Sequence, residues 1–326
     1  MTSAKVSVVI VNWHSEDLLA ATLTALDQQT IAPDRVVIVD NGSSKPLPTD
    51  RYSRGPIVVL PIGRNAGFAG GNNRAIQESA DAEWLALLNP DAIPEPDWLR
   101  QLMAASRRYP DVSAFGSVQL DGTDASILDG LGDVYHVSGA AWRKGHGLPN
   151  GPRSAEPFEI FAPCAAAALY RRSTLVEAGG FDEDFFCYLE DVDLGFRLRL
   201  LGHKAMLVPT AIVRHLGGAT SGGDQSDFAV YHGQRNLVWA YVKNMPQAYL
   251  WRYLPQHLLF NVASLLFFAS RGQALTIMRA KWHALKGLPR MLGKRKAIQG
   301  SIRVSPEELR KSMAKGWLLP YLRRLH

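Results

Sequence analysis

The sequence predicts an α/β protein with a mostly parallel central sheet flanked by helices, followed by an appended C-terminal helical region. In the first half, apolar β-branched runs alternate with amphipathic stretches, which is the pattern of βαβ units. The runs are apolar throughout, as expected for strands that are covered on both faces. With 326 residues, 47% of them hydrophobic, the chain is long enough to bury a large core.

Four short apolar runs are expected to be strands, at residues 6–11, 36–39, 57–60 and 84–88. Ser15 can cap a helix that carries four leucines on one side, Leu18, Leu19, Leu23 and Leu26. A second helix is expected after Gly70-Gly71, and a third from about Pro96-Asp97 to Tyr109-Pro110.

Beyond Val118 the alternation gives way to a stretch rich in Gly and Asp that reaches Pro157 and predicts long loops and irregular strands. Regular structure is expected again over 158–170, and a helix from about Glu190 to Leu201, with Gly202 as its stop. We place a boundary near residue 245. It separates a domain over 1–245 from a basic, partly apolar helical region over 246–326.

The composition of the chain limits the cellular compartments and the binding partners that we expect for it. Cys164 and Cys187 are the only cysteines, which argues against a secreted protein stabilised by several disulfides. We therefore expect a reducing compartment, the cytoplasm. The apolar run at 6–11 is too short for the core of a signal peptide. From Arg271 to His326 there are fourteen Lys or Arg against two Glu. Such a segment attracts nucleic acid, anionic lipid or phosphate groups, unless it is only a solvated helical surface.

Residues 254–269 form an apolar stretch that is interrupted by polar side chains, Gln256, His257, Asn261 and Ser264. It is too short and too polar for a membrane span. Two alternatives stay open. It is a buried helix, or it is a helix that lies on a membrane surface with basic residues beside it.

Polar residues follow each expected strand, at the edge where open parallel sheets bind ligands. They are Asn12-Trp13-His14, Asp40-Asn41-Gly42-Ser43, Gly63-Arg64-Asn65 and Asn89-Pro90-Asp91. Any one of them alone would be read as a turn, but together they predict a site. The glycine-rich stretch 67–73 lacks the G-x-G-x-x-G spacing, and a P-loop is also absent from the sequence. Hydride transfer is therefore disfavoured, while a helix start there could still bind a nucleotide through its N–H groups.

Five of these segments resemble, in order and spacing, those of family 2 glycosyltransferases, and most closely the bacterial rhamnosyltransferase-like branch. The resemblance covers roughly residues 5 to 245 and rests on residues 6–13 (VSVVIVNW), 39–43 (VDNGS), 64–73 (RNAGFAGGNN), 88–92 (LNPDA) and 188–194 (YLEDVDL). Each piece is weak alone, and the combination is specific for the family.

The resemblance implies a GT-A fold and inverting transfer from a nucleoside-diphosphate sugar, with a donor half over about 1–118 and an acceptor half over about 119–245. It assigns donor-nucleotide binding to Val11, Asn12, Trp13, Asp40, Arg64, Asn65, Gly67, Phe68, Asn73 and Asn89. It also makes Asp91 and His215 candidate ligands of Mg²⁺ or Mn²⁺, which would neutralise the leaving diphosphate. The family's common Asp-x-Asp is here Asn89-Pro90-Asp91, so one anionic ligand is missing.

Inverting transfer needs one base beside the acceptor hydroxyl. Adjacent residues on a helix point about 100° apart, so only one of Glu190 and Asp191 can face the sugar. The resemblance selects Asp191 as the base, and we expect Glu190 and Asp182 to bind the acceptor. Acidic residues in a first helical turn also complement the helix dipole without any catalysis. Arg235 is a further candidate for a contact with the diphosphate.

The sequence therefore predicts an enzyme that transfers one sugar, rhamnose or a hexose, from a dTDP- or UDP-sugar to a glycan or lipid-linked glycan acceptor in bacterial cell-envelope polysaccharide synthesis. We expect it in the cytoplasm at the inner face of the membrane, in peripheral contact with anionic lipid and without nucleic acid. A nucleotidyltransferase that forms sugar nucleotides is an alternative, but the Gly-rich basic loop that it needs after the first strand is missing. A catalytically silent carbohydrate-binding or scaffold protein is another, against which Asp40, Asp91 and Asp191 argue.

Overall fold

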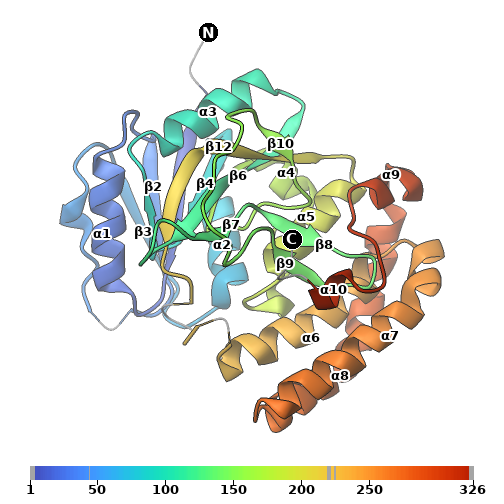
Figure 1. Ribbon diagram of the computed structural model, residues 1–326. Coiled ribbons are helices and arrows are strands. Elements are labelled where there is room, and N and C mark those ends of the chain that lie inside the picture. Colours follow the sequence, from blue (N-terminus) through green and yellow to red (C-terminus); the bar gives the residue numbers. More distant parts are fainter. Residues whose placement is uncertain (1–3, 44, 219–221, 224, 323–326) are drawn as a thin grey trace.

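A mixed sheet forms the centre of the molecule, with helices on both of its faces (Figure 1). The structure is a computed structural model that describes residues 4–43, 45–218, 222–223 and 225–322. Within these residues the strand order is β10-β12-β6-β11-β4-β1-β2-β3, with β5 paired to β12 and β7 paired to β6. A separate two-stranded sheet is formed by β8 (Asp133–Tyr135) and β9 (Ala141–Arg143).

The four strands expected in the first half are confirmed as β1 (Val6–Asn12), β2 (Arg35–Asp40), β3 (Ile57–Pro61) and β4 (Trp84–Leu88). They pair in parallel, β1 between β2 and β4, and β2 beside β3. Because parallel strands end at one edge, their polar carboxyl-terminal residues lie on the same side of the sheet. The predicted α/β fold with a central sheet flanked by helices is confirmed, with parallel strands in the first half and a mixed sheet overall.

The three helices expected in this half are present as α1 (Glu16–Asp27), α2 (Gly67–Glu78) and α3 (Trp98–Arg108). Ser15 precedes α1 as expected, but its hydroxyl donates to the Trp13 carbonyl and does not cap the helix. The expected start of α2 was wrong, because Gly70 and Gly71 lie inside its first turns. A Cβ on Gly71 would come within 2.5 Å of a Val11 methyl carbon, so this glycine lets α2 pack closely against β1.

The second half completes the sheet with strands of both directions. β6 (Val112–Asp121) runs past the expected break at Val118, and β11 (Ala167–Arg171) lies antiparallel between β6 and β4. β12 (Lys204–His215) is parallel to β6 and also pairs with β5 (Ala92–Pro94). Shorter elements of this half are β7 (Leu128–Gly130), β10 (Phe158–Glu159), α4 (Arg172–Glu177) and the 3-10 helices η1 (Thr49–Arg51) and η2 (Glu183–Phe185).

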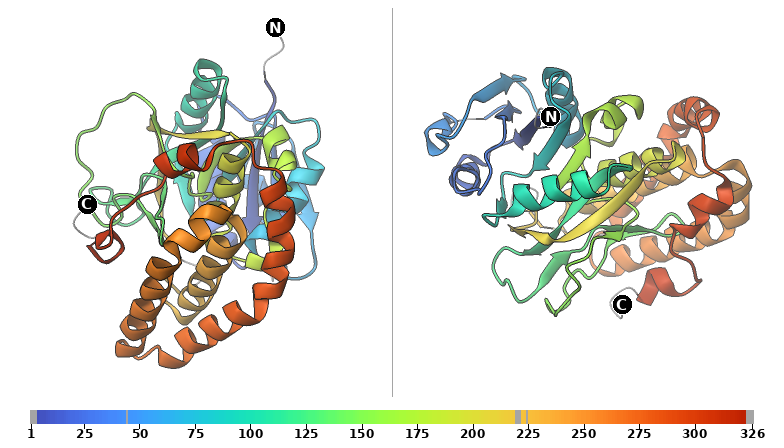
Figure 2. Two further views of the ribbon diagram at one scale, coloured as in Figure 1. Left: turned by 90° about the vertical axis from the view of Figure 1, so that its right-hand side faces the viewer. Right: turned by 90° about the horizontal axis from the view of Figure 1, so that it is seen from above.

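The expected helix at Glu190 is confirmed as α5 (Glu190–Leu200), and Gly202 follows it with φ of +91°, as a helix stop requires. The remaining chain is helical and gathers at one side of the sheet (Figure 2). It consists of α6 (Asp227–Asn244), α7 (Gln247–Ser270), α8 (Ala274–Gly300), α9 (Pro306–Lys311) and α10 (Leu319–Leu322). Pro246 separates α6 from α7 near the expected boundary, and the division into two regions stays a prediction. In the described part of the chain, none of the helices combines the length and apolarity needed to cross a membrane.

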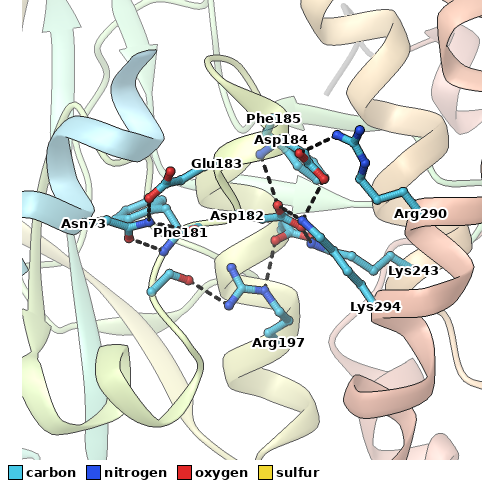
Figure 3. Close-up of polar contacts among 12 residues, drawn as sticks. Asn73, Phe181, Asp182, Glu183, Asp184, Phe185, Arg197, Lys243, Arg290 and Lys294 are labelled. Atoms are coloured by element: carbon cyan, nitrogen blue, oxygen red, sulfur yellow. Dashed lines mark hydrogen bonds and ion pairs between the residues drawn. The ribbon is translucent and has the colours of Figure 1, made fainter. Parts of the chain in front are cut away.

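A buried cluster of charges joins α5 to the C-terminal helices (Figure 3). The Lys243 amine of α6 lies 2.6 Å from Asp182 and 2.7 Å from Asp193, and Asp193 also accepts a hydrogen bond from Arg197 at 2.9 Å. Lys294 of α8 pairs with Asp182 as well. Lys243 is 1% and Asp193 0% exposed, so each of these charges depends on its partners to stay inside the protein.

Replacing Lys243 should therefore destabilise the fold strongly. We expect Lys243→Met to lower the free energy of unfolding by about 3–5 kcal/mol, because Asp182 and Asp193 lose a buried partner. Arg290→Met is a matched control, since Arg290 pairs with Asp184 at the solvent-exposed side of the same cluster and should cost less than about 1 kcal/mol. Urea unfolding of both variants measures this, and equal losses would mean that the buried pairs do not hold the helices together.

Candidate functional site

A pocket of about 410 Å³ opens at the carboxyl edge of the sheet, which is a volume typical of ligand sites. It extends from the ends of β1 and β4 across to the first turn of α5 and to α6. Most of the predicted site residues line it, namely Val11, Trp13, Asn65, Gly67, Phe68, Asn89, Asp91, Glu190, Asp191 and His215. The structure thus brings the two acidic motifs, a hundred residues apart in the sequence, into one pocket.

Asp91 and His215 lie side by side because β5 pairs with β12, which sets Ala92 opposite His215. The His215 Nε2 atom lies 3.4 Å from an Asp91 carboxylate oxygen, and its Nδ1 atom is 2.8 Å from Asp129. Asp129 is held in turn by Arg143, whose nearest nitrogen is 2.5 Å away. Burial opposes protonation of His215, but the hydrogen bond to Asp129 and the neighbouring Asp91 carboxylate outweigh it and raise the pKa of the imidazole to about 9.

These two side chains fit a divalent cation. The His215 Nε2 atom is buried, has no hydrogen-bond partner and faces the Asp91 carboxylate. Asp129 fixes the opposite ring nitrogen, as carboxylates do for metal-bound imidazoles. Among the described residues no three His, Cys, Asp or Glu side chains are arranged to hold a metal ion by themselves. Two protein ligands suit a cation whose other positions are filled by diphosphate oxygens and water.

The acidic end of the pocket holds Asp191, Glu190 and Asp133. Burial raises the pKa of Asp191, while the backbone N–H groups of Ala165 and Val192, 3.1 and 2.8 Å away, limit the rise. Burial and the neighbouring Asp191 raise the pKa of Glu190 and of Asp133 well above their ordinary values. Glu190 and Asp133 each keep one buried oxygen without a hydrogen-bond partner. Asp191 is therefore the member of this group that ionises most easily.

A strained turn precedes α5 and forms part of the pocket wall. Phe186, Tyr188 and Leu189 all have φ of +66°, which is costly for residues with side chains. Asn236 of α6 holds the turn, since its amide donates to three carbonyls, those of Phe185, Cys187 and Tyr188, at 2.9, 3.0 and 2.7 Å.

Five predicted residues lie outside the pocket lining. Asp182 is ion-paired to Lys243 and Lys294, which lower its pKa to about 2 against the effect of burial. Its carboxylate is thus committed to the charge cluster, and the structure lends no support to its expected contact with the acceptor.

The Asn73 side chain clamps the loop at Phe181, donating to the carbonyl and accepting from the N–H. Asn12 is fully buried and donates to Ser43, and Asp40 accepts from the backbone of the turn that follows it. Their roles in donor binding, and that of the exposed Arg64, stay predictions.

Arg235 is likewise not among the residues that line the pocket. Its guanidinium donates to the carbonyls of Asp184 and Phe185 and stacks on Trp239. Its expected contact with the diphosphate stays a prediction.

Sequence reasoning missed Asp129, Asp133, Arg143 and Asn236. The first three come from the short strands β7, β8 and β9, inside the stretch where the sequence shows no period. Asn236 lies in the middle of a helix and carries no motif. Asp129, Asp133 and Asn236 are buried polar residues, but their burial becomes visible only in the structure.

Comparison with known proteins identifies this arrangement. The model of the family described as "Glycosyl transferase family 2" matches residues 7–176, which include Asp91 and the ends of β1 to β4. The chain belongs to glycosyltransferase family 2. This confirms the resemblance drawn from the sequence motifs, and the enzyme is a sugar transferase.

Relatives within family 2 include N-acetylglucosaminyl-diphospho-decaprenol L-rhamnosyltransferase of Mycobacterium tuberculosis. It is 30% identical over 260 residues, which are 71% of this chain and 82% of the relative. An O-antigen chain rhamnosyltransferase of Salmonella typhimurium is 27% identical over 219 residues, which cover 65% of this chain and 66% of that protein. The rhamnosyltransferase-like branch expected from the sequence is thus confirmed.

Solved structures confirm the GT-A fold. GalNAc-T7 with UDP, GalNAc and Mn²⁺ superposes with a TM-score of 0.62 at 17% identity, over 81% of this chain and 51% of that one. A mannosyltransferase from Pyrobaculum calidifontis in complex with GDP-Man and Mn²⁺ gives 0.54 at 15% identity, over 94% and 85% of the two chains.

The turn before α5 should depend on Asn236. We expect Asn236→Ala to lower the free energy of unfolding by about 1–3 kcal/mol, because buried carbonyls lose their donor. We also expect kcat to fall, since the turn leads directly into Glu190. Gln299→Ala, which removes one half-buried hydrogen bond to the Asn244 carbonyl, is the control. Thermal unfolding and transfer kinetics test both, and a normal kcat in Asn236→Ala would show that the turn is not needed for catalysis.

Proposed function

We propose that this enzyme transfers one L-rhamnose or hexose, with inversion, from a dTDP- or UDP-sugar to a lipid-linked glycan at the inner face of the bacterial membrane. The rhamnosyltransferase relatives support the sugar, and the decaprenol-linked substrate in the name of the mycobacterial relative supports the acceptor. The observation that carries the proposal is the single pocket that holds the Asp91–His215 pair at one end and Asp191 at the other.

Asp191 is the proposed base. Its carboxylate takes the proton from the acceptor hydroxyl as that oxygen attacks the anomeric carbon of the donor. The bond from the anomeric carbon to the diphosphate breaks at the same time, and the nucleoside diphosphate leaves with the electron pair. Two backbone N–H groups, of Ala165 and Val192, hold the Asp191 oxygens in place before the reaction. Attack from the face opposite the diphosphate inverts the anomeric configuration.

The end of the pocket with Asp91 and His215, the donor end, can take up a cation that balances the negative charge of a diphosphate. Asp91 and His215 would hold Mg²⁺ or Mn²⁺, which neutralises charge on the leaving diphosphate when it is bound. The Mn²⁺ in the two similar structures supports this cofactor. Asn65 and Trp13 are exposed and line the same pocket, and we expect them to contact the nucleotide.

The acceptor end is lined by two carboxyl groups, those of Glu190 and Asp133, whose pKa values are raised by burial and by Asp191. Glu190 and Asp133 each have an unpaired buried oxygen in the pocket, and a protonated carboxyl can both donate to and accept from a sugar hydroxyl. We therefore place the acceptor sugar against Glu190 and Asp133. Asp182, ion-paired outside the pocket lining, has no part in this proposal.

Asp191→Asn should abolish transfer and leave nucleotide binding nearly unchanged, because the amide keeps the shape and cannot take a proton. Product formation is measured with polyprenyl-diphosphate-linked N-acetylglucosamine and each donor, dTDP-rhamnose first and UDP-hexoses next. Donor binding is measured by thermal shift with and without Mn²⁺, since a ligand that binds the native state raises its apparent stability. Near-normal turnover in Asp191→Asn would remove this residue from the mechanism.

The transfer rate should fall as the pH is lowered through the pKa of Asp191. The base acts only when ionised, and burial raises its pKa, so the lower limb of the kcat/KM profile should lie above the ordinary carboxylate value of about 3.9. The profile is measured over the pH range in which the fold remains intact. A midpoint at or below the ordinary value would contradict the buried setting of this base.

The same assays distinguish a sugar transferase from the two alternatives, a nucleotidyltransferase and a catalytically silent binding protein. A nucleotidyltransferase would form a sugar nucleotide from a sugar phosphate and a nucleoside triphosphate, with no acceptor present. A silent binding protein would bind sugar or nucleotide and give neither transfer nor donor hydrolysis under any metal.

A further inference from the structure

Large apolar side chains are exposed along one side of α7. Trp251, Leu258, Val262 and Leu266 recur at spacings of seven, four and four residues, so they lie on one face of the helix. This face is turned to solvent, with Leu258 55% and Val262 57% exposed, while His257 and Phe260 face the protein. The alternative of a buried helix therefore holds for the inner face only.

The second helix of the hairpin, α8, repeats the pattern. Leu275, Met278, Trp282 and Leu285 follow one another at alternating steps of three and four, and all are exposed, Leu275 to 80%. On the opposite side, Ile277 and other small or apolar residues are buried. A monomeric protein rarely leaves such continuous apolar faces uncovered, which marks a surface that meets a partner.

The charge of the residues around α7 and α8 indicates which kind of surface these apolar faces meet. Between Phe228 and Pro306 there are twelve Lys or Arg and no Asp or Glu. Arg279 and Lys286 are exposed on α8 within a turn of Trp282, and Arg252 is exposed beside Trp251 on α7. An apolar face with Trp and Leu that is bordered by basic residues is the pattern of helices that lie in the surface of an anionic membrane. A second copy of the same basic hairpin would instead be repelled.

The hairpin tip lies next to the pocket. Arg271 donates to the Gln225 side chain at 2.9 Å, and Gln273 bonds to the Gln225 carbonyl and to Asp227. Asp227 begins α6, whose next residue, Phe228, lines the pocket. Figure 1 shows α7 and α8 extending away from the sheet on the side where α6 starts.

We propose that the α7–α8 hairpin lies in the surface of an anionic lipid bilayer through its two exposed apolar faces, and so holds the pocket at the membrane. The role of this contact in bringing the pocket to its acceptor rests on the proposed function, because a lipid-linked acceptor has its sugar at the bilayer surface. The contact itself needs no transfer reaction and can be measured without one.

The test is flotation of the full chain with vesicles of phosphatidylcholine alone and with added phosphatidylglycerol. We expect binding to the anionic vesicles that weakens with salt. Arg279→Gln with Lys286→Gln should lower the partition coefficient at least about tenfold, from the contribution of each basic residue near an anionic surface. Leu258→Ser, Val262→Ser and Trp282→Ser together should abolish binding to both kinds of vesicle.

The matched control replaces an exposed apolar and an exposed basic residue elsewhere, Val176→Ser with Lys204→Gln. It should bind vesicles like the unchanged protein. Thermal unfolding and nucleotide binding of the hairpin variants show that their fold is intact.

Equal vesicle binding by the control and the hairpin variants would overturn the proposal. It would also be overturned if the protein ignored vesicles and instead formed a dimer, seen by sedimentation, that the hairpin substitutions dissociate. A wrong proposed function would give a different result from a wrong membrane contact: the protein would still bind vesicles but would transfer no donor sugar.

Discussion

Lys243 lies in the interior of the protein between two aspartates, and much of the site depends on this arrangement. Burial lowers the pKa of the amine, and the charges of Asp193 and Asp182 oppose that effect. Asp193 is two residues after the proposed base on α5, Asp182 precedes the strained turn, and Lys243 lies in the last turn of α6. None of these elements can move away without leaving a buried charge unpaired. The position of Asp191 is thus fixed by charges that face away from the pocket.

Strand pairing sets the other end of the site. The antiparallel contact of β5 with β12 places Asp91 beside His215, and β7 brings Asp129 behind the imidazole. Asp129 and His215 belong to strands of the sheet, and Asp91 directly precedes β5, so the pairing of the strands fixes the spacing of all three side chains. This suits a reaction in which charge develops at a fixed place on the leaving diphosphate.

The sequence was sufficient for the parts of the fold that repeat. Strands β1 to β4 were predictable because each is an apolar run that alternates with an amphipathic stretch. The polar residues at their carboxyl ends were predictable because they directly follow these runs. The residues missed, such as Asp129 and Asn236, act through partners that are distant in the sequence and leave no such pattern. The ion pairs of Asp182 were not predictable for the same reason, because its partners, Lys243 and Lys294, lie on helices far along the chain.

The meeting of α2 with the strained turn has a consequence for the two substrates. A Cβ on Gly67 would come within 2.4 Å of the Phe186 carbonyl oxygen, and that oxygen accepts a hydrogen bond from the Ala69 N–H. The helix start that lines the donor wall and the turn that leads to the acceptor wall are therefore in direct contact, through this backbone hydrogen bond and through the Phe186 ring, which also occupies the place of a Gly67 Cβ. If one substrate displaces its wall, the affinity for the other changes by a factor that is the same in either order of binding.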